Sequence, residues 1–509
     1  MVLSRKKATF LNMIFTAAYQ LVTALFGFIL PHMLLNTYGA ELHGYTSTVN
    51  SIMSYIALIN AGLAPAAVQA LYAPLAKKDN QRISEVLNAI NRFYVKSGFL
   101  YTVAVILCAV VLPFVISNQI PDYLVISLMI AIGATNTLDC FVYSKYRALL
   151  QADQRLFVVS MVDTVAYFFR IAVQVFLIKT GCSIVLVMGI PAVLVLARTV
   201  VLSYYCKKVF PQLDSKIKPD YSALSKRWSA MIHQLAGLVV YNTDVTLLTI
   251  FGSLIEVSIY SVYNLVFGHL YNLIANIFSN GTVASFGQLL HEDKRKSMLR
   301  AFDLYEFGYY VIVSFVYGVT ASMILPFVSV YTREQVSIPY VDVKLAVLFV
   351  LIGFANNMKV PSTTMINAAG HFKETQWRAV LEAVINLSVS LILVKPLGMY
   401  GLLIGTVCSF SYRTADIVYY SHKHILFLSC KKTIARIIRV LSCILISVAI
   451  YHLLFGKYMI NTWLMWILYA VFASIITGFV VLIVHMATDF KTTKECIKFF
   501  LKGKKLKLF

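Results

Sequence analysis

Charged side chains are scarce in this sequence. Only 13% of its 509 residues are Asp, Glu, Lys or Arg, and 59% are hydrophobic, whereas ordinary soluble domains have roughly 25% and 45–50%. Acidic residues are the rarest charged group, 22 against 44 basic residues, which gives a net charge of +22. A composition this apolar excludes an ordinary soluble domain and indicates a membrane protein.

Paired cysteine and histidine motifs are also missing. The eight cysteines are scattered along the chain, without a CxxC pair and without neighbouring histidines at metal-ligand spacing. They are Cys108, Cys140, Cys182, Cys206, Cys408, Cys430, Cys443 and Cys496. This spacing predicts neither a disulfide framework nor a metal site.

Long apolar runs are present throughout the chain and predict an all-α polytopic membrane protein. Runs that can cross about 30 Å of hydrocarbon predict fourteen helices, near residues 10–35, 44–64, 93–117, 122–145, 156–178, 183–206, 229–251, 258–283, 304–330, 341–367, 377–394, 397–422, 433–455 and 459–487. The first run is longer than a signal-peptide core and lacks an A-x-A cleavage site, so we expect it to be a spanning helix.

Lys and Arg residues alternate between successive connections. One set of connections, which includes both termini, holds 34 of the 44 basic residues. The opposite set holds only Lys179, Arg333, Lys344, Lys395 and Lys457. The positive-inside rule therefore predicts a multi-pass protein of the cytoplasmic membrane with both termini in the cytoplasm. The excess positive charge is then a topology signal, and we expect no nucleic-acid partner.

One stretch of the sequence recurs. Residues 36–82 contain an apolar run that breaks at Gly62 and Pro65, and then a helical segment that ends in basic residues. Four residues recur in order, as Gly39 and Gly252, Tyr45 and Tyr260, Gly62 and Gly281, and Gln69 and Gln288. The repeat predicts two pseudo-symmetric six-helix lobes around a central cavity. The predicted parts are an N-terminal lobe (1–206), a cytoplasmic linker (207–228), a C-terminal lobe (229–430), and two extra helices with a basic cytoplasmic tail (431–509).

Three stretches resemble a known family. They are NAGLAPAAVQALYAPLAKKD from Asn60, ALLQADQRLFVVSMVDTVAYFFRIAVQVFLI from Ala148, and MINAAGHFKETQWRAVLEAVINLSVSLILVKPLGMYGLLIGTVCSF from Met365. With the helix pattern, they make the chain similar to the bacterial polysaccharide flippases of the multidrug/oligosaccharidyl-lipid/polysaccharide exporter superfamily.

The resemblance implies a function and partners. The implied function is translocation of polyprenyl-pyrophosphate-linked oligosaccharide repeat units across the cytoplasmic membrane by alternating access, for capsule, exopolysaccharide or a related cell-surface polysaccharide. The implied partners are this lipid-linked oligosaccharide, the bilayer, and other membrane proteins of polysaccharide assembly. No cofactor is expected.

Basic residues inside the predicted helices are candidates for binding pyrophosphate. A charge inside a bilayer is costly, so such residues are functional candidates, and a guanidinium matches phosphate oxygens in a bidentate geometry. The candidates are Arg170, Arg198, Lys359 and Arg413. Arg170 lies deepest, while the other three can also extend along their helices towards the cytoplasmic end. Asp416, one turn after Arg413, predicts a local ion pair.

Polar side chains in three predicted helices are candidates for contact with the sugars. The candidates are Asn12 and Gln20 in the first helix, Gln234 and Asn242 in the seventh, and Asn264, His269, Asn272 and Asn276 in the eighth. Such side chains also form hydrogen bonds between neighbouring membrane helices, and this alternative stays open.

Three aspartates are candidates for coupling transport to a proton or sodium gradient. A buried carboxylate with a raised pKa is the usual proton carrier in transporters. The candidates are Asp139, Asp163 and Asp244, and Asp244 ranks first because no basic residue lies within one turn of it. Glu382, near the predicted cytoplasmic boundary, is expected to be solvated.

Two other functions in the same superfamily stay open. A lipid II flippase would also have fourteen helices and a cationic cavity. An ion-coupled multidrug exporter would share the fold, but it would favour an anionic cavity for cationic drugs. An enzyme acting on lipid-linked sugars would carry catalytic groups on a sizeable outer loop, whereas the longest one predicted here spans residues 331–342. We therefore expect no enzymatic activity.

Overall fold

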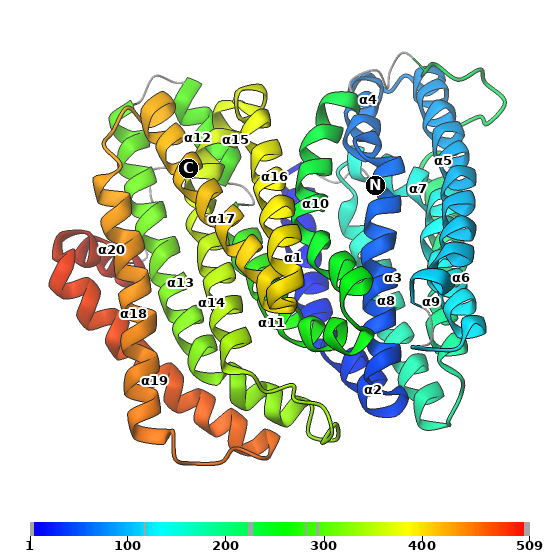
Figure 1. Ribbon diagram of the computed structural model, residues 1–509. Helices are drawn as coiled ribbons and strands as arrows, with labels where there is room; N and C mark the ends of the chain where they lie inside the picture. Colours follow the sequence, from blue (N-terminus) through cyan, green and yellow to red (C-terminus); the bar gives the residue numbers. More distant parts are fainter. Residues whose placement is uncertain (1–4, 117–118, 222–226, 280–281, 292–294, 503–509) are drawn as a thin grey trace. The chain divides into compact units, whose positions relative to one another are not determined.

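The computed structural model describes residues 5–116, 119–221, 227–279, 282–291 and 295–502 (Figure 1). Every regular element in these ranges is a helix, so the predicted all-α polytopic fold is confirmed. In the same ranges, ten helices are long and apolar enough to cross a membrane. The remaining predicted spans fall on helices that are shorter or more polar, and the chain is a multi-pass membrane protein.

The elements fall on the predicted spans, several of which are divided into two or three helices. In chain order they are α1 (Arg5–Phe26), α2 (Ile29–Tyr38), α3 (Ala40–Ile56), η1 (Ala57–Asn60), α4 (Leu63–Lys77), α5 (Asn80–Val115), α6 (Asp122–Leu138), η2 (Asp139–Tyr143), α7 (Ser144–Ala152), α8 (Leu156–Lys179), α9 (Ile184–Val209), α10 (Arg227–Phe251), α11 (Leu254–Ser279), α12 (Thr282–His291), α13 (Arg295–Tyr331), α14 (Val343–Met358), α15 (Val360–Ala369), α16 (Phe372–Leu397), α17 (Met399–Ser421), η4 (His422–Leu426), α18 (Lys431–Phe455), α19 (Trp463–Thr488) and α20 (Phe490–Lys502).

The chain forms two compact units, Met1–Ser258 and Ile259–Phe509. Helix α10 packs against α3 in the first unit. The predicted lobe boundaries, at residues 206 and 229, were placed from the sequence repeat. The two compact units are defined by packing and do not test these boundaries, which remain a prediction.

The order of helices after α3 recurs after α11. Gly62 takes a left-handed φ of 74° between η1 and α4, a conformation that glycine adopts without a steric penalty. The short helix α4 then leads into α5, which has 36 residues, and the short helix α12 leads into α13, which has 37. The predicted break at Gly62 is confirmed, and its predicted equivalent at Gly281 lies outside the described residues.

The first part of the predicted linker packs on the start of α5. The side-chain amide of Asn88 donates hydrogen bonds to the carbonyls of Asp214, at 3.0 Å, and Ile217, at 2.9 Å. Arg82 forms an ion pair with Asp220 at 2.5 Å. The linker up to residue 221 therefore belongs to the first unit.

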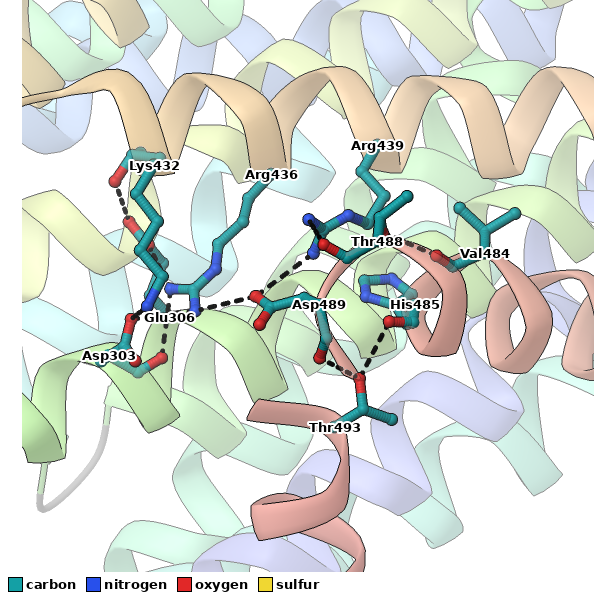
Figure 2. A network of polar contacts seen from close by, with 11 residues as sticks. Asp303, Glu306, Lys432, Arg436, Arg439, Val484, His485, Thr488, Asp489 and Thr493 are labelled. Atoms are coloured by element: carbon teal, nitrogen blue, oxygen red, sulfur yellow. Dashed lines mark hydrogen bonds and ion pairs between the residues drawn. The ribbon is translucent and has the colours of Figure 1, made fainter. Parts of the chain in front are cut away.

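Helices α18 and α19 pack against α13 in the second unit (Figure 1). Arg436 of α18 is only 1% exposed. Its guanidinium lies 2.8 Å from Glu306 and 2.9 Å from Asp303, both on α13 (Figure 2). Buried charges thus contribute to the attachment of the two extra helices, together with apolar packing.

Asp489 extends this network to the end of α19. Its carboxylate lies 3.4 Å from Arg436 and 3.5 Å from Arg439 (Figure 2). Burial raises the pKa of Asp489, but a hydrogen bond from Thr492 and the charges of the two arginines hold it below its usual value. The hydroxyl of Thr493 donates to the carbonyl of His485 at 3.1 Å, so α20 is joined to α19 at the same place.

Candidate functional site

Three helices of the first unit bring an arginine and two aspartates together. Arg198 of α9 forms ion pairs with Asp139, at the start of η2, and with Asp163 of α8, at 3.3 Å. The guanidinium lies 4.1 Å from the centre of the Tyr143 ring. The Tyr143 hydroxyl, 2.7 Å from the nearer carboxylate oxygen, donates a hydrogen bond to Asp163. We call Asp139, Tyr143, Asp163 and Arg198 the first charge cluster.

The π-helical turn η2 places two members of this cluster. It spans Asp139–Tyr143, between α6 and α7, and contributes its first and last residues to the site. A π turn inserts one extra residue into a helix and often occurs at functional sites. Here it lets one stretch of chain provide both the carboxylate that pairs with Arg198 and the ring beneath the guanidinium.

Helices α16 and α17 of the second unit, with Lys359 between α14 and α15, carry a second cluster of charges. Glu382 of α16 lies 3.1 Å from Lys359 and 3.3 Å from Arg413 of α17. Arg413 also lies 3.4 Å from Asp416, which pairs with Arg378. The predicted pair between Arg413 and Asp416 is confirmed. The expectation that Glu382 is solvated is wrong, because two cations enclose its carboxylate and it is only 8% exposed. We call these five residues the second charge cluster.

The two clusters lie at nearly the same separation in the sequence as the predicted repeat. The matching pairs by separation are Asp139 and Lys359, Asp163 and Glu382, and Arg198 and Arg413, which lie 220, 219 and 215 residues apart. The predicted repeat has a separation of 219 residues at Gly62 and Gly281. The sign of the charge changes at one position, from aspartate to lysine. The first cluster consequently has more carboxylates than cations, and the second has more cations than carboxylates.

Arg170 lies beside the first cluster, on α8. It lines a pocket of about 70 Å³ together with Tyr19, Tyr167, Asp163 and Arg198. Its guanidinium lies 4.7 Å from the centre of the Tyr167 ring, and its Nε is buried without a hydrogen-bond partner in the described part of the chain. Among the described residues, Arg170 takes part in no ion pair. An arginine in this setting can bind an incoming anion.

The other cationic candidates already have acidic partners. Arg198 pairs with two aspartates, and Lys359 and Arg413 share Glu382. None of the three therefore extends alone towards the end of its helix, and a substrate phosphate would compete with these carboxylates. Arg170 differs from these three cations because it has no acidic partner among the described residues.

The polar candidates of α10 and α11 lie outside both clusters. Asn242 donates its amide hydrogen to the carbonyl of Leu238 in its own helix, at 3.1 Å. Asp244 is 2% exposed, His269 is half-buried, and Asn264 and Asn272 are exposed. Their roles in substrate binding and ion coupling remain predictions.

A structural role accounts for Asn12. Its side-chain oxygen accepts a hydrogen bond from the backbone N–H of Phe157 at 2.7 Å, and its amide donates to the carbonyl of Gln154 at 3.0 Å. These bonds join α1 to the start of α8. Gln20 is exposed, and the side chains of Gln234 and Asn276 lie outside the described residues.

Sequence reasoning missed two features of these sites. Tyr143 was not a candidate, although it follows Asp139 by four residues, a spacing that places two side chains on one helical face. Arg436 was one of the 34 basic residues assigned to the cytoplasmic connections, although it falls inside the predicted helix 433–455. Its position within a span was the available signal for a buried ion pair.

No protein-family profile matches the sequence, and no curated protein matches it. The structure is similar to that of an inward-facing multidrug resistance MATE family transporter of the MOP superfamily, with a TM-score of 0.63, 14% identity, and coverage of 81% of this chain and 96% of that chain. It is also similar to the lipid II flippase MurJ in an inward closed conformation, with a TM-score of 0.65, 13% identity, and coverage of 94% and 98%. A third similar structure is that of a Vibrio cholerae MATE transporter, with a TM-score of 0.55, 13% identity, and coverage of 83% of this chain and 99% of that chain.

These similarities show the fold. The chain has the fold of the MATE transporters and of the lipid II flippase. The likeness covers 94% of the chain for the lipid II flippase and 81% for the first MATE transporter.

Proposed function

We propose that this protein is a flippase. It moves polyprenyl-pyrophosphate-linked oligosaccharide repeat units from the cytoplasmic to the outer leaflet of the cytoplasmic membrane, by alternating access, for a capsule, exopolysaccharide or related polysaccharide. The observation that carries the proposal is Arg170, a guanidinium in a spanning helix with a buried Nε that has no partner among the described residues. The fold shared with the lipid II flippase supports a substrate made of a saccharide on a lipid carrier.

The Arg170 pocket suits one end of this substrate. The fork of a guanidinium matches two oxygens of a pyrophosphate. Tyr19 and Tyr167 line the same pocket and offer ring faces and hydroxyl groups to the first sugar. The small volume of the pocket fits a phosphate group, so the rest of the saccharide lies outside it.

The first charge cluster suits the coupling step. Two carboxylates face one guanidinium there, so a proton or sodium ion on Asp139 or Asp163 would offset the excess negative charge. Binding of such an ion would weaken the hold on Arg198, which lines the same pocket as Arg170. Arg198 would then become available to the substrate phosphate. In this scheme the Arg198 side chain links ion binding to substrate binding.

Two alternative functions rest on particular observations. The extent of the likeness to the lipid II flippase favours lipid II as the substrate. The similarity to the MATE transporters favours export of cationic drugs. The charge clusters do not decide between these substrates, because the three cations of the second cluster outnumber its two carboxylates, whereas the two carboxylates of the first outnumber its one cation.

The substitution Arg170→Lys tests the proposal in cells. Lysine keeps the positive charge but loses the bidentate fork. Losing one hydrogen bond to a charged group costs about 1.5–3 kcal/mol, so we expect export to be roughly tenfold slower or more. Lipid-linked oligosaccharide should accumulate while the amount of protein in the membrane is unchanged. Arg333→Lys, on a connection, is the matched control, and export by Arg170→Lys at the wild-type rate would remove Arg170 from the site.

A further inference from the structure

A second and larger pocket lies in the second unit between α13, α14 and α18. Its volume is about 510 Å³. Its walls are mainly aliphatic, with Leu325 of α13, Val347 and Val350 of α14, and Leu445 and Val448 of α18 among them. It shares no residue with the two charge clusters or with the Arg170 pocket.

The pocket is open to the surroundings of the spanning helices. Helices α13 and α18 are each long and apolar enough to cross a membrane, and so is the segment Val343–Ala369, which consists of α14 and α15. On the rim of the pocket, Val343, Val347 and Leu445 are 63%, 52% and 61% exposed. Exposed aliphatic side chains on the outside of spanning helices contact the hydrocarbon of the bilayer, and the aliphatic rim of this pocket suits such contact. A lipid chain can therefore enter this pocket sideways from the bilayer.

One end of the pocket is polar. Tyr451, His452 and Tyr458 line it at the end of α18 and in the turn that follows. Tyr451 is only 6% exposed, and its hydroxyl is buried without a hydrogen-bond partner in the described ranges. Tyrosine is enriched where a membrane helix reaches the interface. The pocket thus has an apolar body within the membrane and a polar end where an unpartnered hydroxyl is available.

We propose that this pocket binds one acyl chain of a bilayer phospholipid, with the ester region of the lipid at the Tyr451 hydroxyl. The ligand is a phospholipid and not a polyprenyl-pyrophosphate carrier, because none of the lining residues in the described part of the chain is Lys or Arg. A pyrophosphate would need such cations. The phospholipid comes from the outer leaflet if the predicted topology holds, since α18 starts in the predicted cytoplasmic region.

Photochemical labelling tests this site directly. The purified full-length protein is placed in nanodiscs that contain a phosphatidylcholine with a diazirine on its acyl chain, and labelled peptides are mapped after irradiation. We expect strong labelling of residues 343–351 and 441–456. Val347→Trp, which fills the pocket from its exposed rim, should reduce this labelling at least fivefold. Leu453→Trp, at a position on α18 that is 86% exposed and outside the lining, is the matched control and should leave it unchanged.

The polar end has its own test. Tyr451→Phe keeps the ring and removes the hydroxyl, so native mass spectrometry of the detergent-purified protein should show at least a twofold loss of bound phospholipid. Equal labelling in wild type, Val347→Trp and Leu453→Trp would overturn the proposal, as would unchanged lipid retention in Tyr451→Phe. Displacement of the label by polyprenyl phosphate at a lower concentration than by unlabelled phosphatidylcholine would overturn the choice of ligand. None of these results depends on flippase activity.

Discussion

Arg436 joins α18 to α13 through a buried ion pair whose contribution can be measured. Both side chains of the pair with Glu306 are 2% exposed, and the two groups are 2.8 Å apart. The substitution Arg436→Met leaves the Glu306 carboxylate buried without this cation. Breaking a buried pair from one side typically costs about 3–5 kcal/mol. We expect the lower end of this range, because the Thr433 hydroxyl still donates to Glu306 at 2.8 Å.

The assay is thermal unfolding of the purified protein in detergent. A cost of about 3 kcal/mol corresponds to a decrease in Tm of roughly 6–12 °C for a unit of this size. Arg436→Met combined with Glu306→Gln removes both charges and should recover most of the loss. The remaining acids keep other partners, since Asp303 pairs with Lys432 and Asp489 with Arg439.

An exposed ion pair provides the control for this experiment. Arg300 pairs with Glu495 at 3.6 Å, and its side chain is 71% exposed. Surface pairs contribute about 0–1 kcal/mol, so Arg300→Met should change Tm by no more than roughly 4 °C. If Arg436→Met costs no more than Arg300→Met, or if the double variant is as unstable as the single one, burial of the pair is not the source of its effect.

Three further predictions concern packing, pH and topology. A Cβ on Gly44 would lie 1.9 Å from the carbonyl oxygen of Leu254, so Gly44→Ala should lower the stability of the first unit by about 1–3 kcal/mol in thermal unfolding. The folded-state pKa of Asp489 lies below its usual value. The stability that this carboxylate contributes is therefore complete above about pH 4 and is lost as the pH falls through the folded pKa. Thermal unfolding measured across this pH range should show a weaker pH dependence for Asp489→Asn than for the wild type. Single cysteines in residues 207–228 and 331–342 should react with an impermeant reagent from opposite sides of the membrane, and labelling from the same side would refute the topology.

The helices of this fold were predictable because each one can be recognised from its own stretch of sequence. Apolar runs of sufficient length give the spans, and the distribution of Lys and Arg gives their expected orientation. The break at Gly62 was also local, since a glycine followed three residues later by a proline favours the start of a new helix. These signals need no knowledge of which helices pack together.

The charged sites were only partly predictable, since their partners come from distant helices. Sequence position suggested that Arg198 and Arg413 extend towards the interface, yet each is paired with carboxylates of neighbouring helices. Glu382 was placed in solvent because it lies near a predicted boundary, but the packing of α16 on α17 encloses it. Whether a charge near a helix end is solvated or paired depends on the tertiary packing, and this is not encoded in the spacing of one helix.

The most direct measurement of the proposed function is transport in vesicles that contain the purified protein as their sole protein. A polyprenyl-pyrophosphate-linked oligosaccharide is placed in both leaflets, and its sugar is made accessible to a lectin from outside only. The proposal predicts movement between leaflets well above that in protein-free vesicles, and movement roughly tenfold slower or more with Arg170→Lys. Equal rates for wild type and Arg170→Lys, or transport of lipid II or a cationic dye without transport of the oligosaccharide, would contradict it.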